Sequence, residues 1–430
     1  MKRFLAVLSL VCLASSGTIG VAQKPAARSL VITNARILDG RGGVIERGTV
    51  TVRDGKIVSV APGAGTVAGA PVIDAKGMTV MPGFIESHRH IIRGNPAQWM
   101  KEEAAPRMQE YLDAGFTTVL SAGDPLEQIL ELRKRTETGD VKGPRIIASG
   151  RAQLARAGGG GGAAGAPAID PARSDRSRGP RTTAAAIPPE ETRATVASLA
   201  KAGVDAIKTA IIVTPNGPEK ETLSLIVKEA KQYNIPVITH AVTVLDTVAA
   251  VEAGVAVLVH TPHIGRLEES PDTARMIAKA GIPMMSTLGI FVPFFGNDNM
   301  PLFRDRGPFP WETLSSGGQG PVNARLLWEA GITYGYGTDS SWLPKDSLAQ
   351  ELKPLALMFS PKEIVSILTK NAAAAVLRSD QIGTLEAGKV ADIVILNGDP
   401  LANVSNLLNV SVVVKGGQVV VDKRSGQGTR

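Results

Sequence analysis

Cysteine is almost absent from this chain of 430 residues, which contains only Cys12. That residue lies in an N-terminal stretch with a basic start, an apolar core and the small residues 20–22, the pattern of a cleaved secretory signal over residues 1–22. No Leu stands three residues before Cys12, which disfavours a lipoprotein cleavage site. The processed chain would then lack cysteine, which excludes disulfides, a thiol nucleophile and a cysteine-ligated metal.

Long apolar runs are also missing, and so are aromatic residues within the basic cluster. The N-terminal apolar stretch is shorter than the roughly 20 residues that a membrane span needs, so we expect no stable membrane anchor and predict export, to a periplasm or out of the cell. Removal of residues 1–22 takes the formal charge from +7 to +5, and only residues 173–181 form a basic cluster. No aromatic residues interleave with this cluster, so we interpret it as a solvated loop and expect no nucleic-acid partner.

Short β runs occupy both ends of the chain. Residues 29–81 contain apolar runs separated by turn signals such as Asp39-Gly40, and residues 376–424 contain similar runs. The expected strands are Leu30–Ile32, Thr49–Val52, Ile57–Val60, Ala391–Leu396, Val412–Lys415 and Gln418–Val420. We expect the two segments to form one small β-sandwich domain beside a central domain.

Residues 82–375 alternate apolar β runs with longer helical stretches, which predicts an α/β fold, a (β/α)8 TIM-like barrel. The expected strands are Gly83–Glu86, Thr117–Ser121, Arg145–Ala148, Ala206–Ile212, Pro236–Thr239, Val255–Val259, Pro283–Ser286 and Thr333–Gly337, and the helices include Pro189–Ala202, Glu219–Tyr233 and Ser270–Ala280. A doubly wound sheet is the alternative, disfavoured because no Gly-rich phosphate loop follows an early strand. The Gly/Ala/Pro-rich stretch 151–189 is expected to be a flexible insertion, either a lid or a disordered segment.

The chain has five histidines, and four of them end expected strands of the barrel. His88 and His90 end the first strand and project on one face, because side chains alternate along a strand. His240 and His260 end two later strands, at the face where such barrels carry their active sites. Asp339 ends the eighth strand, and Lys208 lies within an apolar strand, where an unpaired charge is costly.

Two motifs carry a resemblance to a known family. Residues 82–90 read PGFIESHRH and residues 383–394 read GTLEAGKVADIV. They resemble the first-strand motif and the C-terminal signature of the metal-dependent amidohydrolase superfamily, in its imidazolonepropionase-like branch, with relatives among prolidases and metallocarboxypeptidases. The similarity runs from about Leu30 to Val420, although Glu86 stands where Asp is commoner.

This resemblance implies two divalent metal ions. His88, His90 and Asp339 would hold one ion and His240 and His260 the other, with Lys208 bridging them as an N-carboxylated lysine. Imidazole and carboxylate ligands favour zinc over manganese or iron. Asp339 would take a proton from the metal-bridging water, whose hydroxide attacks the substrate, and pass it to the leaving group.

Three features bear on the substrate. His263 would touch substrate or the oxyanion or orient a ligand, with a plain surface histidine as the alternative. Five of the nine phenylalanines fall within residues 291–309, which indicates either an apolar substrate pocket or ordinary loop packing. Residues 149–151 and 214–217 depart from the Gly-Gly-His motif and the Tyr/Arg clamp of the prolidase relatives, which disfavours a free α-carboxylate substrate.

We therefore expect an exported metal-dependent amidohydrolase that cleaves an amide, cyclic amide or dipeptide C–N bond in a small-molecule or dipeptide-like substrate, which would be apolar if the phenylalanine-rich stretch lines its pocket. Hydrolysis of an ester or lactone at the same binuclear site is the alternative. A deaminase is less favoured, because those sites are usually mononuclear and lack the fourth-strand lysine. A non-catalytic binding barrel is disfavoured by the intact set of six ligands. A homo-oligomer is expected only by analogy with the family.

Overall fold

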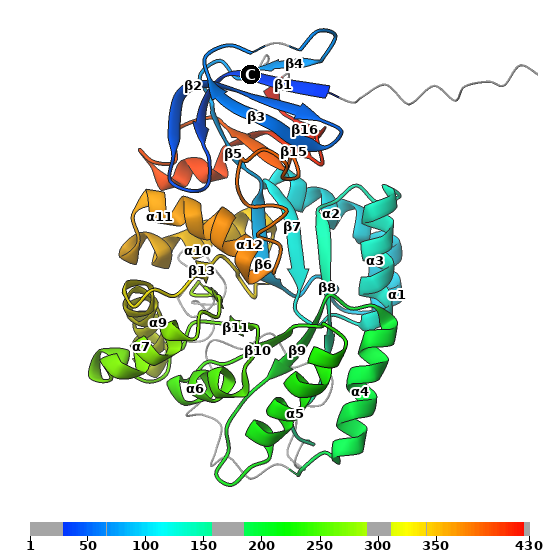
Figure 1. Ribbon diagram of the computed structural model, residues 1–430, viewed down its shortest axis with the longest axis vertical. Helices are drawn as coiled ribbons and strands as arrows, with labels where there is room; N and C mark the ends of the chain where they lie inside the picture. The colour runs from blue at the N-terminus through cyan, green and yellow to red at the C-terminus, as the bar shows by residue number, and fades with distance from the viewer. Residues whose placement is uncertain (1–28, 66, 157–184, 290–310, 341, 425–430) are drawn as a thin grey trace, which may run out of the picture.

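A barrel surrounded by helices carries a small β domain at one end of its long axis (Figure 1). This computed structural model describes residues 29–65, 67–156, 185–289, 311–340 and 342–424. The expected signal sequence (1–22), most of the insertion and the phenylalanine-rich stretch 291–309 lie outside the described residues, so export, lid and apolar loop stay predictions. Within the described residues, no helix is long and apolar enough to cross a membrane.

The small domain is a sandwich-like sheet made from both ends of the chain. Its strand order is β16-β15-β14-β5-β1-β2-β3, with β4 paired to β1. The strands are β1 (Ser29–Leu38), β2 (Val44–Arg53), β3 (Lys56–Pro62), β4 (Val72–Asp74), β5 (Thr79–Pro82), β14 (Ile393–Leu396), β15 (Val410–Lys415) and β16 (Gln418–Asp422). Because β5 pairs with β1 on one side and with β14 on the other, the predicted split domain is confirmed.

The C-terminal strands of this sheet serve two cores at once. Alternate residues of a strand point to opposite faces. On β14, Ile393 and Ile395 join the core of the small domain, whereas Val394 and Leu396 join the core of the barrel. The resulting apolar contact fixes the small domain against the barrel.

The barrel consists of eight parallel strands in chain order. They are β6 (Phe84–Arg89), β7 (Phe116–Ser121), β8 (Arg145–Arg151), β9 (Ala206–Ala210), β10 (Val237–His240), β11 (Val257–Val259), β12 (Met284–Met285) and β13 (Tyr334–Gly335). The first and last strands meet, because Ser87 N donates to Tyr336 O at 3.2 Å and Asp339 N donates to His88 O at 2.9 Å. The predicted (β/α)8 barrel is thereby confirmed.

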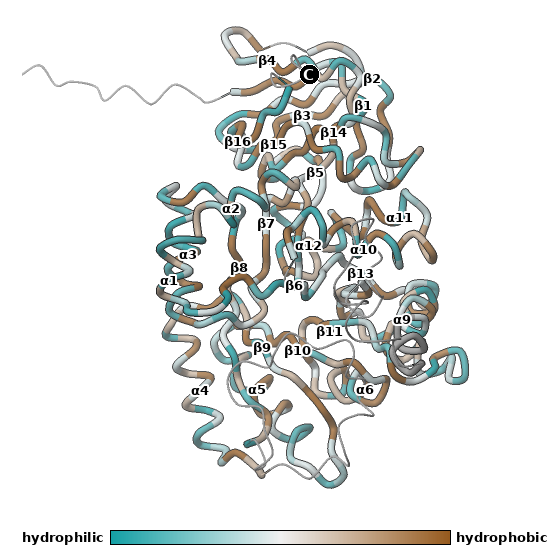
Figure 2. Tube along the Cα trace, turned by 180° about the vertical axis from the view of Figure 1, so that it is seen from behind, coloured by the Kyte–Doolittle hydropathy of each residue, from teal (hydrophilic) through white to brown (hydrophobic). Residues whose placement is uncertain are grey.

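Helices cover the outside of the barrel. They are α1 (Pro96–Glu102), α2 (Ala104–Asp113), α3 (Leu126–Thr138), α4 (Pro189–Ala202), α5 (Glu219–Gln232), α6 (Val244–Ala253), α7 (Pro271–Lys279), α9 (Trp311–Glu329), α10 (Pro344–Met358), α11 (Pro361–Ser366) and α12 (Ala372–Ala375), with shorter turns η2 (Leu267–Glu269), η3 (Ile367–Asn371) and η4 (Val404–Leu408). Figure 2 shows that β7 and β8 are mostly hydrophobic. In the same view hydrophilic and hydrophobic residues alternate along α4, as expected for a helix with one face on the barrel. α4 ends at Ala202, and Gly203 caps it in a left-handed conformation with a φ of 76°.

The last strands are shorter than predicted. The expected strand Pro283–Ser286 is reduced to β12, and Thr333–Gly337 is reduced to β13. Hydrogen bonds continue from Thr287 N to Gly337 O, but Thr287 adopts a left-handed conformation with a φ of 47°. The regular ladder therefore stops where the chain turns its side chains toward the barrel mouth.

The insertion leaves and rejoins the barrel at one place. Arg156 N donates to Ala185 O at 2.9 Å, and Arg156 also pairs with Glu191 on α4. Residues 157–184 therefore connect two points that already lie side by side.

Candidate metal centre

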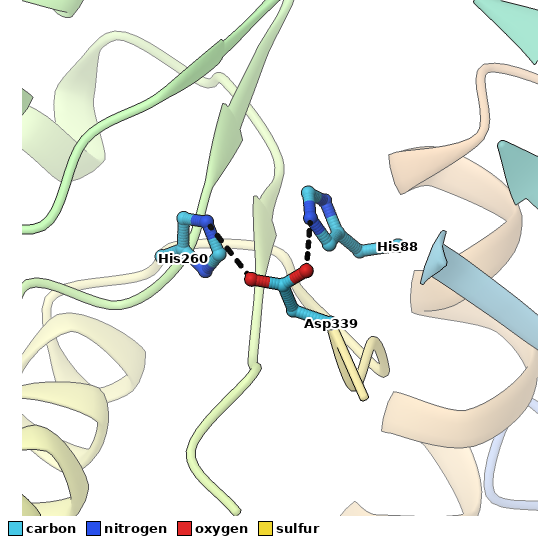
Figure 3. A group of neighbouring side chains, drawn as sticks. All are labelled: His88, His260 and Asp339. Atoms are coloured by element: carbon cyan, nitrogen blue, oxygen red, sulfur yellow. Dashed lines mark ion pairs between the residues drawn. The ribbon is translucent and has the colours of Figure 1, made fainter. Parts of the chain in front are cut away.

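Asp339 and three histidines converge at the end of the barrel where the first and last strands meet. His88 lies on β6, His90 follows that strand, and each Nε2 is 3.3 Å from Asp339 Oδ1. His260 approaches from the other side, with its Nε2 3.9 Å from Asp339 Oδ2. Figure 3 shows the carboxylate of Asp339 between the rings of His88 and His260.

His240 and Lys208 extend this group across the neighbouring strands. The ring of His240, at the end of β10, lies 4.4 Å from that of His260 between centroids. Lys208 is buried on β9, where it is aligned with Ile238 of β10. The charge of Lys208 acts on His240 and Asp339, so the lysine faces the same cluster. All six predicted metal ligands therefore lie at one end of the barrel.

Left-handed backbone turns aim two of these side chains inward. His260 directly follows β11 with a φ of 77°, and Asp339 lies four residues after β13 with a φ of 50°. Such conformations are uncommon for residues other than glycine and cost free energy unless their surroundings hold them. The sequence shows no sign of this strain, which is found here at the proposed ligands.

Burial keeps the imidazoles neutral. It lowers the pKa of His90 to about 3, against the opposing charge of Asp339. Burial also lowers the pKa of His88, and it holds the pKa values of His240 and His260 well below their usual range. A neutral imidazole has a free lone pair, which is the form that binds a metal ion.

The pKa values of the Asp339 carboxylate and the Lys208 amine are shifted as well. Burial alone would raise the pKa of Asp339, but His88, His90 and Lys208 outweigh burial and hold the pKa below its usual range. Burial lowers the pKa of Lys208 to about 7, and Asp339 opposes this shift. Near neutral pH the cluster thus combines neutral imidazoles, an ionised carboxylate and an amine that is partly uncharged.

These residues fit a divalent cation. Ligand atoms of His88, His260 and Asp339 all lie within 4.8 Å of one another. Tetrahedral ligands about 2.0–2.1 Å from zinc lie about 3.3–3.4 Å apart, close to the 3.3 Å between Asp339 Oδ1 and the histidine nitrogens. His88 Nδ1 is buried and has no hydrogen-bond partner in the described part of the chain.

A hydrogen-bond latch holds Asp339 against the strand that carries His88. Glu86 Oε1 accepts from His88 N at 2.9 Å and Thr338 N at 3.0 Å, and Oε2 accepts from Thr338 Oγ1 at 2.7 Å. Arg89 Nη1 donates to the same Thr338 hydroxyl at 3.0 Å. The latch thus fixes the residue before Asp339 from two sides.

Neighbouring loops are fixed in a similar way. Asp124 accepts hydrogen bonds from the backbone N–H groups of Ile91 and Ile92, both at 3.0 Å, and so holds the chain just after His90. Thr287 Oγ1 lies 2.7 Å from His260 Nδ1, which orients that ring with its Nε2 toward Asp339.

His263 lies beside the cluster, and its charge affects His240 and His260. It is buried, with 8% of its surface exposed, so the interpretation as a surface histidine is wrong. Sequence reasoning assigned no role to Glu86, Arg89 or Thr338. The sequence does place the charged residues Glu86 and Arg89 around His88, and the structure buries both of them, but the sequence gives no signal for Thr338.

Comparisons with known proteins agree with this fold. A model described as "Amidohydrolase family" matches residues 79–420. An imidazolonepropionase of Thermoanaerobacter pseudethanolicus is 23% identical over 410 residues, which are 88% of this chain and 91% of the relative. The structure of a Xaa-Pro dipeptidase with bound methionine in the active site matches with a TM-score of 0.72 and 22% identity, over 91% of this chain and 100% of that chain. The structure of phenylurea hydrolase B matches with a TM-score of 0.68 and 25% identity, over 92% of this chain and 97% of that chain.

Proposed function

This chain belongs to the amidohydrolase family and is a hydrolase of C–N bonds, and we propose that it cleaves an amide, cyclic amide or dipeptide bond with two divalent metal ions, most simply zinc. The proposal rests above all on one observation, the convergence of three histidines on Asp339 beside the buried Lys208. The relatives act on imidazolonepropionate-type, dipeptide or phenylurea substrates, as their names state. These substrates share a C–N bond next to a carbonyl group.

The ligands divide into two sets. In this proposal His88, His90 and Asp339 hold one ion, and His240 and His260 hold the other. Bound divalent ions polarise a carbonyl group and lower the pKa of water enough to make it a nucleophile at neutral pH. Imidazole and carboxylate donors suit zinc.

Lys208 is proposed to bridge the two sets as a carbamate. Its neutral Nζ attacks the carbon of CO2, an N–C bond forms as one C–O π bond breaks, and a proton leaves the nitrogen for solvent. The reaction needs an uncharged amine, and a pKa of about 7 provides one near neutral pH. The product is a carboxylate, which removes the cost of a buried ammonium group.

Asp339 is proposed as the proton carrier. The carboxylate is ionised because its pKa is lowered, and Oδ2 is proposed to accept a proton from the attacking water. The same oxygen then donates that proton to the leaving nitrogen, which departs as a neutral amine. The latch from Glu86 and Thr338 holds Asp339 in place during both transfers.

Metal content per chain tests the proposal. Elemental analysis should find close to two divalent ions in the wild type and clearly fewer in Lys208→Ala, because the bridge is lost. Lys415→Ala is the control, since Lys415 is half-buried but donates to Gly143 O, away from the six proposed ligands. One ion in both wild type and Lys208→Ala would refute the lysine bridge. No tightly held metal after purification with zinc and bicarbonate would refute metal-dependent hydrolysis.

A further inference from the structure

A cavity of about 670 Å³ opens beside His90. Its walls come from the loop after β6, from helices α1 and α2, and from the segment that leads into α10. Three aromatic residues contribute to the lining, Trp99, Tyr111 and Trp342. The cavity therefore joins an aromatic surface to a proposed metal ligand.

Most of the charges around this cavity are neutralised or exposed. Arg107 forms ion pairs with Glu103 and Glu110, both at 3.0 Å. Asp346 is exposed to solvent at the rim. The outer part of the cavity thus has no buried charge that a ligand would need to balance.

Arg93 is different. It is half-buried and lines the cavity three residues after His90, where its Nη2 donates to Ser340 O at 3.3 Å. In the described part of the chain it forms no ion pair. An arginine has five N–H donors in a planar fork, so most of the donors of Arg93 remain available for a ligand.

A second guanidinium adds to the positive charge. Arg89 also lines the cavity, and its hydrogen bonds go to the neutral groups Thr338 Oγ1, Ser347 Oγ and Trp342 O. Burial and the charge of Arg89 lower the pKa of Arg93, and the charges of Asp124 and Asp339 oppose this shift. The nearby carboxylate of Asp124 is already bonded to two backbone N–H groups and to Ser121 Oγ. Within the described residues, the carboxylates of Asp124 and Asp339 therefore act on Arg93 only at longer range, and neither forms an ion pair with it.

We propose that this cavity binds a carboxylate group of the substrate through Arg93, with the aromatic walls around an adjoining apolar group. A planar guanidinium can hold a carboxylate with two parallel hydrogen bonds, and aromatic walls suit a ring or a branched chain. The substrate class is then an amide that carries both a carboxylate and an apolar group. The inference rests on the proposed function, because the C–N bond of the bound amide must reach the metal centre from this side.

This contact differs from the one disfavoured by the sequence. The missing clamp would follow the fourth strand, β9, whereas Arg93 follows the first strand, β6. A substrate carboxylate would therefore lie next to His90.

The test uses two probes of matched shape, 3-phenylpropionate and the neutral ketone 4-phenyl-2-butanone, which has no C–N bond to hydrolyse. Isothermal titration calorimetry on the full-length, metal-loaded protein should show the acid binding about 10–100-fold more tightly than the ketone, the usual value of a charge-assisted hydrogen bond. Arg93→Met should lose this preference. Arg107→Met, the matched control on the same cavity wall, should keep the preference within about twofold, because its charge is already paired.

A carboxylate can also bind the metal ions directly, so the variants decide the outcome. Retention of the acid preference in Arg93→Met, an equal loss in Arg107→Met, or equal wild-type affinity for both probes would each overturn the inference. Arg93→Lys guards against misfolding, since it keeps the charge, and it should retain a reduced preference for the acid. Binding is separate from turnover: an Arg93-dependent preference in a protein that hydrolyses no amide would refute the proposed function alone.

Discussion

Replacement of Asp339 by Asn tests the proposed proton carrier with little change of shape. In the wild type, Oδ1 lies 3.3 Å from the Nε2 atoms of both His88 and His90, and Oδ2 lies 3.9 Å from His260 Nε2. An amide keeps one oxygen that can face the same histidines or a metal ion. Its NH2 group cannot accept a proton, so Asp339→Asn removes the base while keeping much of the ligand set.

The expected loss of activity follows from the proposed role of Asp339 as a general base. General acid–base catalysis by a positioned side chain contributes about 10²- to 10⁴-fold, or roughly 3–5 kcal/mol of activation free energy. We expect kcat to fall by that factor with little change in KM, because a base acts in the transition state rather than in substrate binding. Steady-state kinetics and elemental analysis of the same preparation measure both quantities.

A buried aspartate elsewhere provides the control. Asp392 pairs with Arg145 at 2.7 Å and is not near the centre, so Asp392→Asn should lower thermal stability without the large loss of kcat. Full activity of Asp339→Asn would refute the base. Complete loss of metal in that variant would also contradict our expectation, because it would show that the role of Asp339 as a metal ligand cannot be separated from its role in proton transfer.

Two further substitutions test the surroundings of the site. Thr338→Val removes the hydroxyl shared by Glu86 and Arg89, so we expect unfolding by calorimetry to show a loss of about 1–3 kcal/mol and a chelator to remove metal faster; unchanged metal retention would contradict the latch. For Glu351, whose carboxylate accepts from the N–H groups of residues 288 and 289, burial raises the pKa from 4.5 to about 7. Its folded form therefore holds a proton that the unfolded chain has lost, and about 3 kcal/mol of stability present below pH 4 is lost as the pH rises through 7. Melting temperatures of wild type and Glu351→Gln should consequently diverge between pH 5 and 8, and parallel curves would exclude this linkage.

Much of the fold can be predicted from local pattern. Buried parallel strands are nearly continuous apolar runs, so β7 and β8 are found close to their expected places, and α4 spans the predicted residues. The ends of β12 and β13 are not predicted, because apolar character continues past the point where Thr287 turns left-handed. That turn depends on contacts with distant segments.

The metal ligands can be predicted for the same reason as the strands. Parallel strands deliver the residues at their carboxyl ends to one face, so the order of strands alone brings His88, His240 and Asp339 together. The latch cannot be found in this way. Glu86 and Thr338 are 252 residues apart, and only the closed barrel places their side chains within hydrogen-bond distance.

Closure of the barrel and assembly of the metal centre are therefore one event. The first strand supplies His88 and the last supplies Asp339, and the hydrogen bond from Asp339 N to His88 O is itself part of the closure. Until those strands meet, His88 lacks the carboxylate that faces its ring, and Asp339 lacks the support for its strained backbone. A ligand that binds only the assembled site stabilises the folded state by mass action. The first and last strands are far apart in the sequence, so chain entropy opposes their contact more strongly than any other contact between neighbouring strands of the barrel. Divalent metal ions should thus stabilise this contact.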